Sequence, residues 1–447
     1  MTQQVVLTSS IKNLLSSIKN KNTAKLFLKA LTINKGFFFY YQNHLLMSGN
    51  IILFDHYHWT DLLPLTFTRP VSELRIGILT IKEKWERYLQ QQVSYMTEPY
   101  LAEKYPTQLG DENIFINSSI LPDPQIVASV QSLHSGCYIE CEGQIIAASL
   151  PRDIAASISF WSEITALIKD TATKVDIHFN SQFIRRPYDI FVLNGIALLQ
   201  DFELVTKDRK SAPISSSNQV FGKYPVFAEE GVRMECCIIN TTDGPVYLGK
   251  DVEIMEGTMI RGGFAAGEGS IVKMGAKIYG PTTIGPNCRL GGEVNNAVMI
   301  ANSNKGHDGF LGNSVIGEWC NLGADTNNSN LKNNYLPVKI WSYTHATFKD
   351  SGLQFCGLIM GDHSKSGINT MFNTGTVVGV ACNIFGDGFP RTYIPSFSWG
   401  GAAGFTTHQL NKVIETAEIV MKRRHMLLTE TDKNMLREIF IRTFPGL

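Results

Sequence analysis

The sequence lacks the features that mark several classes of protein. Its 447 residues carry 40 basic and 40 acidic side chains, so no net charge favours binding to nucleic acid or another polyanion. No apolar run approaches the roughly 18 residues needed to cross a bilayer, which argues against an integral membrane protein. We therefore expect neither a nucleic-acid partner nor a membrane partner.

The eight cysteines lack the spacing of a metal site or of a disulfide framework. None forms a C-x-x-C pair, and none is grouped with histidine at zinc-binding spacing. Cys236 and Cys237 are adjacent, which suits a disulfide framework poorly. We predict reduced thiols in a cytoplasmic protein.

Residues 1–54 contain six Lys but no Arg, Asp or Glu. A lysine-rich, acid-free start occurs in targeting peptides, but the absence of Arg is unlike a typical transit peptide, and the apolar stretch near Phe37–Tyr41 is too short for a signal-peptide core. A second interpretation is that AT-rich upstream DNA has been translated and that Met47 is the true start. On either interpretation, residues 1–46 are expected to be a non-native or unstructured extension outside the fold.

Residues 47–210 show the pattern of an α/β domain. Ile78–Gln90 has helical spacing, and short apolar runs alternate with helical stretches, which predicts a mixed or parallel sheet covered by helices. Residues 185–207 also have helical spacing and are expected to join this domain to the next. The short apolar runs lie at 51–54, 114–116, 126–130, 137–140 and 145–148.

The stretch LLPLTFTRPVSELRIGILTIKEKW, residues 62–85, resembles the opening of sugar-phosphate nucleotidylyltransferases. In that family a Gly-rich loop and an Arg hold the triphosphate, because backbone N–H groups and a guanidinium suit phosphate oxygens. The resemblance implies a Rossmann-like fold, with Thr68 and Arg69 on the nucleotide phosphates and Mg²⁺ as cofactor. The family's glycines, its following Lys and its metal-binding Asp are missing from their expected places. Asn117 and Asp123 are the nearest metal-ligand candidates, and the ligands stay unassigned.

A period of six residues dominates residues 222–400. An α-helix does not repeat at six and an ordinary strand repeats at two, so the pattern predicts a parallel β-helix of hexapeptide repeats. Three hexapeptides would make one coil with the anchors pointing inward, and the glycines that follow many anchors would turn its corners. The predicted anchors are Leu248, Ile254, Ile260, Ala266, Val272, Ile278, Ile284, Leu290, Val298, Phe310, Ile316, Leu322, Met360, Phe372, Val378 and Ile384.

The period breaks at 299–309 and 326–345, and loops that leave a coil often carry sites. The segment KGHDGFLGNSVIGEWCNLGADTNNSNLKNNY, 305–335, is similar to the acetyltransferase site of bifunctional N-acetylglucosamine-1-phosphate uridylyltransferases/glucosamine-1-phosphate acetyltransferases. This resemblance implies a left-handed β-helix with His307 as the general base that deprotonates a sugar amine as it attacks acetyl-CoA. A neutral imidazole with a pKa near 6.5 suits that task.

The same resemblance implies roles for further residues. Phe310 stands where the family has Tyr, and Gly291 stands where it has a phosphate-binding Arg. A competing interpretation is that His307 is a polar loop residue of a purely structural β-helix. The implied contacts are Lys305 to a sugar phosphate, Asn321, Asn334 and Tyr335 to the acceptor, and Gly323 and Ala324 to acetyl-CoA.

Residues 407–447 have the apolar spacing of two helices. Because the last coil of a β-helix leaves an open edge, we expect these helices to form a cap.

The sequence therefore predicts a transferase of two domains and a cap. We expect it to make a nucleotide sugar similar to UDP-N-acetylglucosamine for the cell envelope, from a sugar 1-phosphate, an NTP (UTP or dTTP) and acetyl-CoA, and to act as a homotrimer. One alternative is a nucleotidylyltransferase with a structural β-helix. The other is a non-catalytic assembly protein that binds nucleotide sugars.

Overall fold

The computed structural model describes residues 49–444, apart from 57, 159 and 178–181. All of the fold described below belongs to the unit Gly49–Leu447. The predicted extension, residues 1–46, lies outside the described residues.

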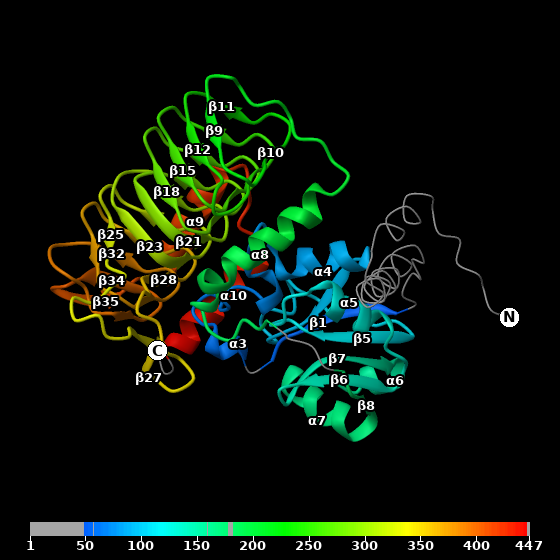
Figure 1. Cartoon of the computed structure of the whole chain (residues 1–447). Helices are drawn as coiled ribbons and strands as arrows, with labels where there is room; N and C mark the ends of the chain where they lie inside the picture. The colour runs from blue at the N-terminus through cyan, green and yellow to red at the C-terminus, as the bar shows by residue number, and fades with distance from the viewer. Residues whose placement is uncertain (1–48, 57, 159, 178–181, 445–447) are drawn as a thin grey trace, which may run out of the picture. The chain divides into compact units, whose positions relative to one another are not determined.

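A six-stranded mixed sheet with the order β4-β1-β5-β7-β6-β8 forms the α/β half (Figure 1). β1 lies between β4 and β5 and runs parallel to both, whereas β7 runs antiparallel to β5 and β6. This arrangement confirms the predicted mixed sheet. Its strands are β1 (Asn50–Phe54), β4 (Val93–Met96), β5 (Glu112–Asn117), β6 (Cys137–Cys141), β7 (Gln144–Pro151) and β8 (Thr173–Val175).

The helices of this half have clear start signals. α4 (Ile81–Leu89) begins with a capping box, in which Thr80 and Glu83 bond each other's backbone N–H groups. The short run at 126–130 belongs to α5 (Pro124–Gln131) and not to a strand, because the N-cap Asp123 and the proline at the first turn start a helix there. The remaining short elements are α3 (His58–Asp61), η1 (Val71–Glu73), β2 (Arg75–Ile76), β3 (Leu79–Thr80), α6 (Arg152–Ala155) and α7 (Trp161–Thr171).

The predicted joining helix is α8 (Asp189–Thr206). It packs against β2 of the α/β half and against three strands of the following half: β19 (Thr282–Ile284), β21 (Glu293–Met299) and β23 (Phe310–Ile316). Asn194, buried in this helix, accepts a hydrogen bond from the Gly77 N–H at 2.7 Å and donates one to the Pro281 carbonyl at 2.9 Å. A single helical side chain thus links the two halves.

Residues 219–400 form a parallel β-solenoid whose coils stack in chain order (Figure 1). Val246 pairs with Phe264 and Phe264 with Thr282, so each of these coils advances 18 residues, which is three hexapeptides. The hexapeptide fold is confirmed. Its handedness stays a prediction.

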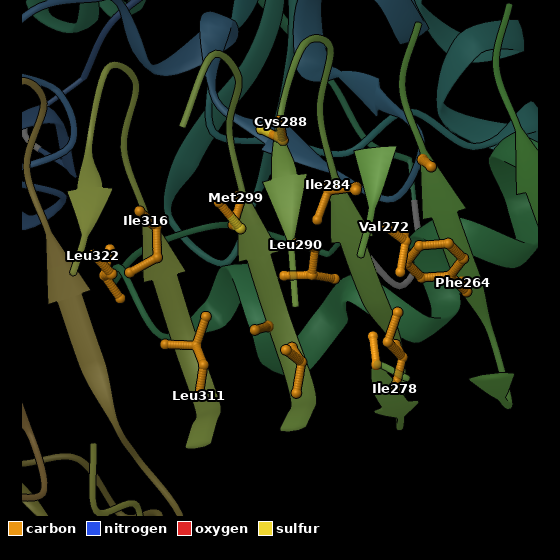
Figure 2. Packing of buried hydrophobic residues seen from close by; sticks show 14 of the residues in the cluster. Phe264, Val272, Ile278, Ile284, Cys288, Leu290, Met299, Leu311, Ile316 and Leu322 are labelled. Carbon is orange, nitrogen blue, oxygen red and sulfur yellow. The ribbon is translucent and has the colours of Figure 1, made fainter. Parts of the chain in front are cut away.

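The aliphatic anchors of successive coils point into one shared interior (Figure 2). Two predicted anchors are wrong: the interior residues are Met299 and Leu311, not Val298 and Phe310. The reason is a shortened coil, because Ile284 pairs with Met299, only 15 residues later. The lost residues shift the period of six ahead of the His307 loop.

The strands of the solenoid are short, which is typical of hexapeptide coils. They are β9 (Gln219–Phe221), β10 (Val226–Ala228), β11 (Arg233–Met234), β12 (Ile238–Asn240), β13 (Val246–Leu248), β14 (Glu253–Ile254), β15 (Met259–Arg261), β16 (Phe264–Ala266), β17 (Ile271–Val272), β18 (Lys277–Tyr279), β19 (Thr282–Ile284), β20 (Arg289–Leu290), β21 (Glu293–Met299), β22 (Asn304–Lys305), β23 (Phe310–Ile316), β24 (Asn321–Leu322), β25 (Asn327–Asn328), β28 (Leu358–Met360), β29 (Lys365–Ser366), β30 (Met371–Phe372), β31 (Thr376–Val378), β32 (Asn383–Ile384) and β33 (Tyr393–Ile394).

One corner of the solenoid is built from alternating serine and cysteine. Ser303 shows the repeated pattern: its hydroxyl donates to the Gly317 carbonyl at 2.7 Å and accepts from the Cys320 N–H at 2.9 Å. Ser270 and Ser364 do the same one or more coils away. All eight cysteines of the chain are free thiols, as predicted.

A hairpin and two helices follow the last coil. β34 (Ser398–Gly401) pairs with β35 (Gly404–Thr407) in an antiparallel hairpin that extends one sheet of the solenoid. α9 (Leu410–Lys422) and α10 (Glu430–Thr443) confirm the two predicted helices. Phe440 contacts Phe397 of the last coil, while Arg442 pairs with Glu98 of the α/β half, so α10 contacts both halves.

A second hairpin leaves the solenoid between two coils. It consists of β26 (Lys339–Ser342) and β27 (Thr347–Asp350). Among the described residues, no helix has the length and apolar character to cross a membrane.

Candidate functional sites

Polar side chains gather where the parallel strands β1, β4 and β5 end. Asp55, directly after β1, accepts hydrogen bonds from the Thr97 hydroxyl at 2.6 Å, the Ser118 hydroxyl at 3.1 Å and the Val71 N–H at 3.0 Å. The carboxyl ends of parallel strands at a point where strand order reverses are where α/β folds bind ligands. In this sheet the chain places β4 on one side of β1 and then β5 on the other side, so the strand order reverses at β1.

Asp55 is completely buried, and this burial raises its pKa to about 7 against the bonds from Thr97, Val71 and Ser118, which lower it. A carboxyl group held at this pKa changes charge near neutral pH. Its hydrogen bonds join three segments: the first residue of η1 and the residues that follow β4 and β5. Asp55 therefore positions the strand edge.

A second group lies beside this edge. Asp61 pairs with His58 at 3.5 Å and with Arg186 at 2.6 Å, and it accepts a hydrogen bond from the Thr344 hydroxyl at 2.6 Å. These partners lower the pKa of Asp61 to about 2 although its burial acts in the opposite direction. Thr344 belongs to the hairpin that leaves the solenoid, so the edge of the α/β sheet is also in contact with the second half.

The Thr-Arg-Pro loop also contacts the solenoid. The Thr68 hydroxyl donates to Asp362 at 2.8 Å, and the Arg69 guanidinium pairs with Asp362 and, at 2.8 Å, with Glu318. Burial disfavours the charge of Arg69, but the two carboxylates together raise its pKa above the ordinary value. Thr68 and Arg69, the residues predicted to bind the nucleotide phosphates, therefore already contact acidic side chains. Their phosphate role stays a prediction.

A pocket of about 50 Å³ borders this ion cluster. Lys104 and Tyr105 of the α/β half, Trp319 and His363 of the solenoid, and residues of α9 and α10 line it together with Arg69. Among the described residues, neither Nε of Arg69 nor Nδ1 of His363 has a hydrogen-bond partner, although both atoms are buried. Burial lowers the pKa of His363 to about 3, so its imidazole is neutral at physiological pH.

The candidate ligands for Mg²⁺ are already engaged. The side-chain oxygen of Asn117 accepts hydrogen bonds from the N–H and the hydroxyl of Ser119, and the Asp123 carboxylate caps α5. Both oxygens of Asp55 accept hydrogen bonds as well. Within the described part of the chain, no group of three metal-ligating side chains occurs. These residues do not fit a resident metal site.

His307 lies exposed on the loop between β22 and β23. The backbone of this loop packs directly on Gly291 and Gly292: a Cβ added at Gly291 would lie 2.6 Å from the Gly306 carbonyl oxygen, and one at Gly292 would lie 2.9 Å from that of His307. No larger residue fits at position 291 without moving the loop.

Lys305, the predicted sugar-phosphate residue, points into the solenoid. It occupies an anchor position beside Leu290 and is buried, and its ammonium group donates to the carbonyls of His307 and Asp308. Burial lowers its pKa to about 8. To reach a ligand, Lys305 would have to leave both carbonyls. In this structure it holds the His307 loop against the coil.

The other predicted acceptor and donor residues are spread over several segments. Asn321 pairs with Asn304 one coil earlier, and their side chains are joined by a 3.3 Å hydrogen bond. Gly323 stacks closely on Gly367, and the Ala324 carbonyl accepts from the Asn369 N–H. Asn334 and Tyr335 are exposed on the excursion that carries β26 and β27. Their proposed contacts stay predictions.

Comparison with known proteins bears on the first half most directly. Residues 51–210 match the family model described as sugar nucleotidyl transferase. No curated protein matches the sequence. A solved structure from Arabidopsis, a UDP-N-acetylglucosamine acyltransferase, aligns at 14% identity over 48% of this chain and 80% of that one, with a TM-score of 0.20. A TM-score this low does not show that the two chains share a fold.

The family match supports the predicted transferase and a role in sugar-nucleotide biosynthesis. It covers just over a third of the chain, so it describes the α/β half alone. The match does not extend to the bifunctional uridylyltransferase/acetyltransferase family that the sequence resembles, which stays a prediction.

Sequence reasoning missed three acidic residues that organise the site. Asp55 could have been found, because an acid directly after a buried strand lies at the ligand-binding edge of an α/β sheet. Glu318 and Asp362 carry no such signal, since they reach Arg69 from 249 and 293 residues away. Only the folded chain brings them together.

Proposed function

We propose that the chain is a sugar-1-phosphate nucleotidylyltransferase. The phosphate oxygen of the sugar attacks the α-phosphorus of an NTP, UTP or dTTP, and pyrophosphate leaves. The Mg²⁺ complex of the NTP is the substrate. The match of residues 51–210 to a sugar nucleotidyl transferase family carries this proposal.

Arg69 binds the triphosphate only after giving up its acidic partners. The two carboxylates occupy both terminal nitrogens of the Arg69 guanidinium and compensate its charge. Nucleotide binding therefore competes with the contact between the Thr-Arg-Pro loop and the solenoid. This competition gives the proposal a specific test.

The test compares turnover in the wild type with that in the double variant Glu318→Gln and Asp362→Asn. Pyrophosphate release and nucleotide-sugar mass are measured over a panel of sugar 1-phosphates. Because the amides keep acceptor oxygens but lose the negative charge, we expect the KM for NTP to fall. The matched control is Glu253→Gln with Asp243→Asn, which neutralises two acids of the solenoid that pair with exposed arginines instead.

Two results would contradict parts of this proposal. Absence of pyrophosphate release with every NTP and sugar 1-phosphate refutes nucleotidyl transfer and favours a protein that only binds nucleotide sugars. Turnover with an unchanged KM in the double variant removes Arg69 from the nucleotide site and leaves the reaction intact.

A second activity, acetyl transfer, is favoured by the exposure of His307 on a loop with tightly packed glycines. His307 accepts the proton of a sugar amine while the amine attacks the thioester of acetyl-CoA, and CoA leaves as the thiol. We expect thiol release with amino-sugar phosphates to be lost in His307→Ala and kept in His134→Ala, which removes another exposed histidine. Pyrophosphate release without thiol release would leave the solenoid as a scaffold.

The remaining features belong to the same proposal. The product is a nucleotide sugar similar to UDP-N-acetylglucosamine for the cell envelope, and the enzyme works in the cytoplasm as a homotrimer. Light scattering on the purified full chain gives the oligomeric state. A monomeric mass under assay conditions would overturn the trimer without affecting either reaction.

A further inference from the structure

Two arginines on the outer face of the solenoid lie close enough for their charges to interact, and no acid of the described residues forms an ion pair with either. Arg289 lies on β20, and Arg424 lies just after α9. Both are half-buried, and neither forms an ion pair with any residue of the described ranges. Cationic groups this close normally share a carboxylate or bind an anion, because the two positive charges repel each other.

Neutral oxygens hold the two guanidinium groups in place. Arg289 donates from one terminal nitrogen to the carbonyls of Gly269 and Cys288, at 2.9 and 3.0 Å. Arg424 donates to the Asn287 carbonyl at 2.7 Å and to the Asn304 side-chain oxygen at 2.9 Å. Asn304 is the strand neighbour of Arg289. The two arginines therefore both lie beside Asn304. Their other N–H groups form no hydrogen bond with the described residues.

Two side-chain amides next to Arg424, those of Asn304 and Asn321, add another hydrogen-bond donor. Asn304 accepts from Arg424 and donates its own amide to the side-chain oxygen of Asn321 at 3.3 Å. This leaves the amide nitrogen of Asn321, an exposed residue, as the outer end of the chain. The face presents donors from three side chains. Glu253, two strands away in the same column, acts on the charge of Arg289 but pairs with Arg233 instead. A face with several donors and no carboxylate paired to them among the described residues suits an anion.

Another arginine on the same outer column provides a contrast. Arg233 lies beside Glu253 in the register and pairs with it at 3.4 Å. The corresponding neighbours of Arg289 are Ile271 and Asn304. The charge of Arg424 helps to lower the pKa of Arg289, after the larger effect of burial. Glu253 thus forms its ion pair with Arg233 and acts on Arg289 only from a distance, which leaves the Arg289–Arg424 pair able to bind an external anion.

We propose that Arg289, Arg424 and Asn321 form a binding site for the phosphate group of a phosphorylated small molecule. Two guanidinium groups suit the several oxygens of a phosphate better than the single charge of a halide. The site lies on the solenoid and goes beyond the nucleotide site proposed for the α/β half.

The position of the site also suggests what its ligand does. Gly306 lies against the side chain of Arg289, because a Cβ at Gly306 would be 3.8 Å from that of Arg289, and His307 follows directly. A phosphorylated acceptor or a nucleotide-type acyl donor held here would have its reactive end near the imidazole. This second step rests on the proposed acetyl transfer, whereas the anion site itself does not.

The experiment measures binding without turnover, so its failure is separate from failure of either proposed reaction. Hydrogen exchange of the full chain is followed by mass spectrometry with and without inorganic phosphate, at constant ionic strength set with chloride. We expect slower exchange in peptides covering 287–291 and 421–428. Glucosamine 1-phosphate and ADP, tested in parallel, distinguish a sugar phosphate from a nucleotide as the source of the phosphate.

The variants are Arg424→Gln and Arg289→Gln, with Arg391→Gln as the matched control, since Arg391 is exposed and its charge does not act on either arginine. Each charge-assisted hydrogen bond that is lost is expected to weaken phosphate binding at least tenfold. The control should bind as the wild type does.

A purely structural pair of arginines would behave differently. Thermal unfolding of each variant is therefore measured with and without phosphate. If the variants are destabilised equally in both conditions, and phosphate protects neither peptide in the wild type, the proposal is overturned. Phosphate protection that survives in both variants overturns it as well, because the anion would then bind elsewhere.

Discussion

Replacing Asp55 by Asn tests whether burial raises the pKa of the carboxyl group at the end of β1. The carboxyl group is completely buried and accepts three hydrogen bonds, from Val71, Thr97 and Ser118. An asparagine keeps the oxygen that accepts from Val71 and Ser118, and its amide can donate to the Thr97 hydroxyl. The substitution therefore imitates the protonated acid at every pH.

The sign of the effect follows from proton binding. The pKa of Asp55 is about 7 in the folded chain, against an ordinary value of 3.8. The folded state thus holds more protons than the unfolded state between these values, and the stability from Asp55 is lost as the pH rises through about 7. At 1.36 kcal/mol per unit of pKa difference, the loss between pH 5 and pH 8 is about 2 to 3 kcal/mol.

Urea unfolding of the wild type and Asp55→Asn at pH 5 and pH 8 measures this difference. We expect the variant to gain about 2 to 3 kcal/mol relative to the wild type on going from pH 5 to pH 8. Asp111→Asn, at a fully exposed side chain, is the matched control and should show no such gain. A pH-independent difference between wild type and Asp55→Asn would refute the argument that burial raises this pKa.

Three other substitutions test the packing around the candidate sites. Arg69→Met removes the partner of two carboxylates and should cost about 3 to 5 kcal/mol of stability in urea unfolding; a loss below 1 kcal/mol would mean that the ion cluster is not buried as described. Lys305→Met removes the donor to the His307 and Asp308 carbonyls, so stability should fall by about 1 to 3 kcal/mol, and unchanged thermal unfolding would contradict its role in holding the loop. Gly291→Ala pushes a methyl group against the loop before His307 and should cost about 1 to 3 kcal/mol, whereas Gly306→Ala, which has room for the methyl, should behave as the wild type.

The period of six predicted the solenoid well because each regular coil contains three hexapeptides. Val246, Phe264 and Thr282 lie one coil apart at 18-residue steps. The prediction failed where the coil from Ile284 to Met299 is three residues shorter. A strict count cannot detect a deletion inside a coil, since Val298 and Phe310 are as apolar as the residues that replace them in the interior.

Secondary structure in the α/β half was predictable except where a local signal was overlooked. The run IVASV at 126–130 has the composition of a buried strand. Asp123 and Pro124 directly before it provide an N-cap and a proline at the first turn, and these start a helix. Here the residues at the start of the segment decide its structure, and the apolar side chains inside it only determine which face is buried.

The candidate sites were less predictable, because a motif does not specify its partners. Lys305 belongs to a motif in which it was expected to contact a sugar phosphate, but the register of the coil turns it inward beside Leu290. Its ammonium group is satisfied by backbone carbonyls, which no sequence pattern records. The same motif leaves His307 exposed, two residues further on.

The two anion sites proposed for this chain differ in their net charge. The cluster around Arg69 contains one guanidinium and two carboxylates, so its charge is negative, and a triphosphate would be repelled until Glu318 and Asp362 move away. Arg289 and Arg424 carry two positive charges and no acidic partner among the described residues, so a phosphate can bind there without displacing any group. Binding at Arg69 must therefore be coupled to the contact between the two halves, while binding at Arg289 and Arg424 need not disturb it.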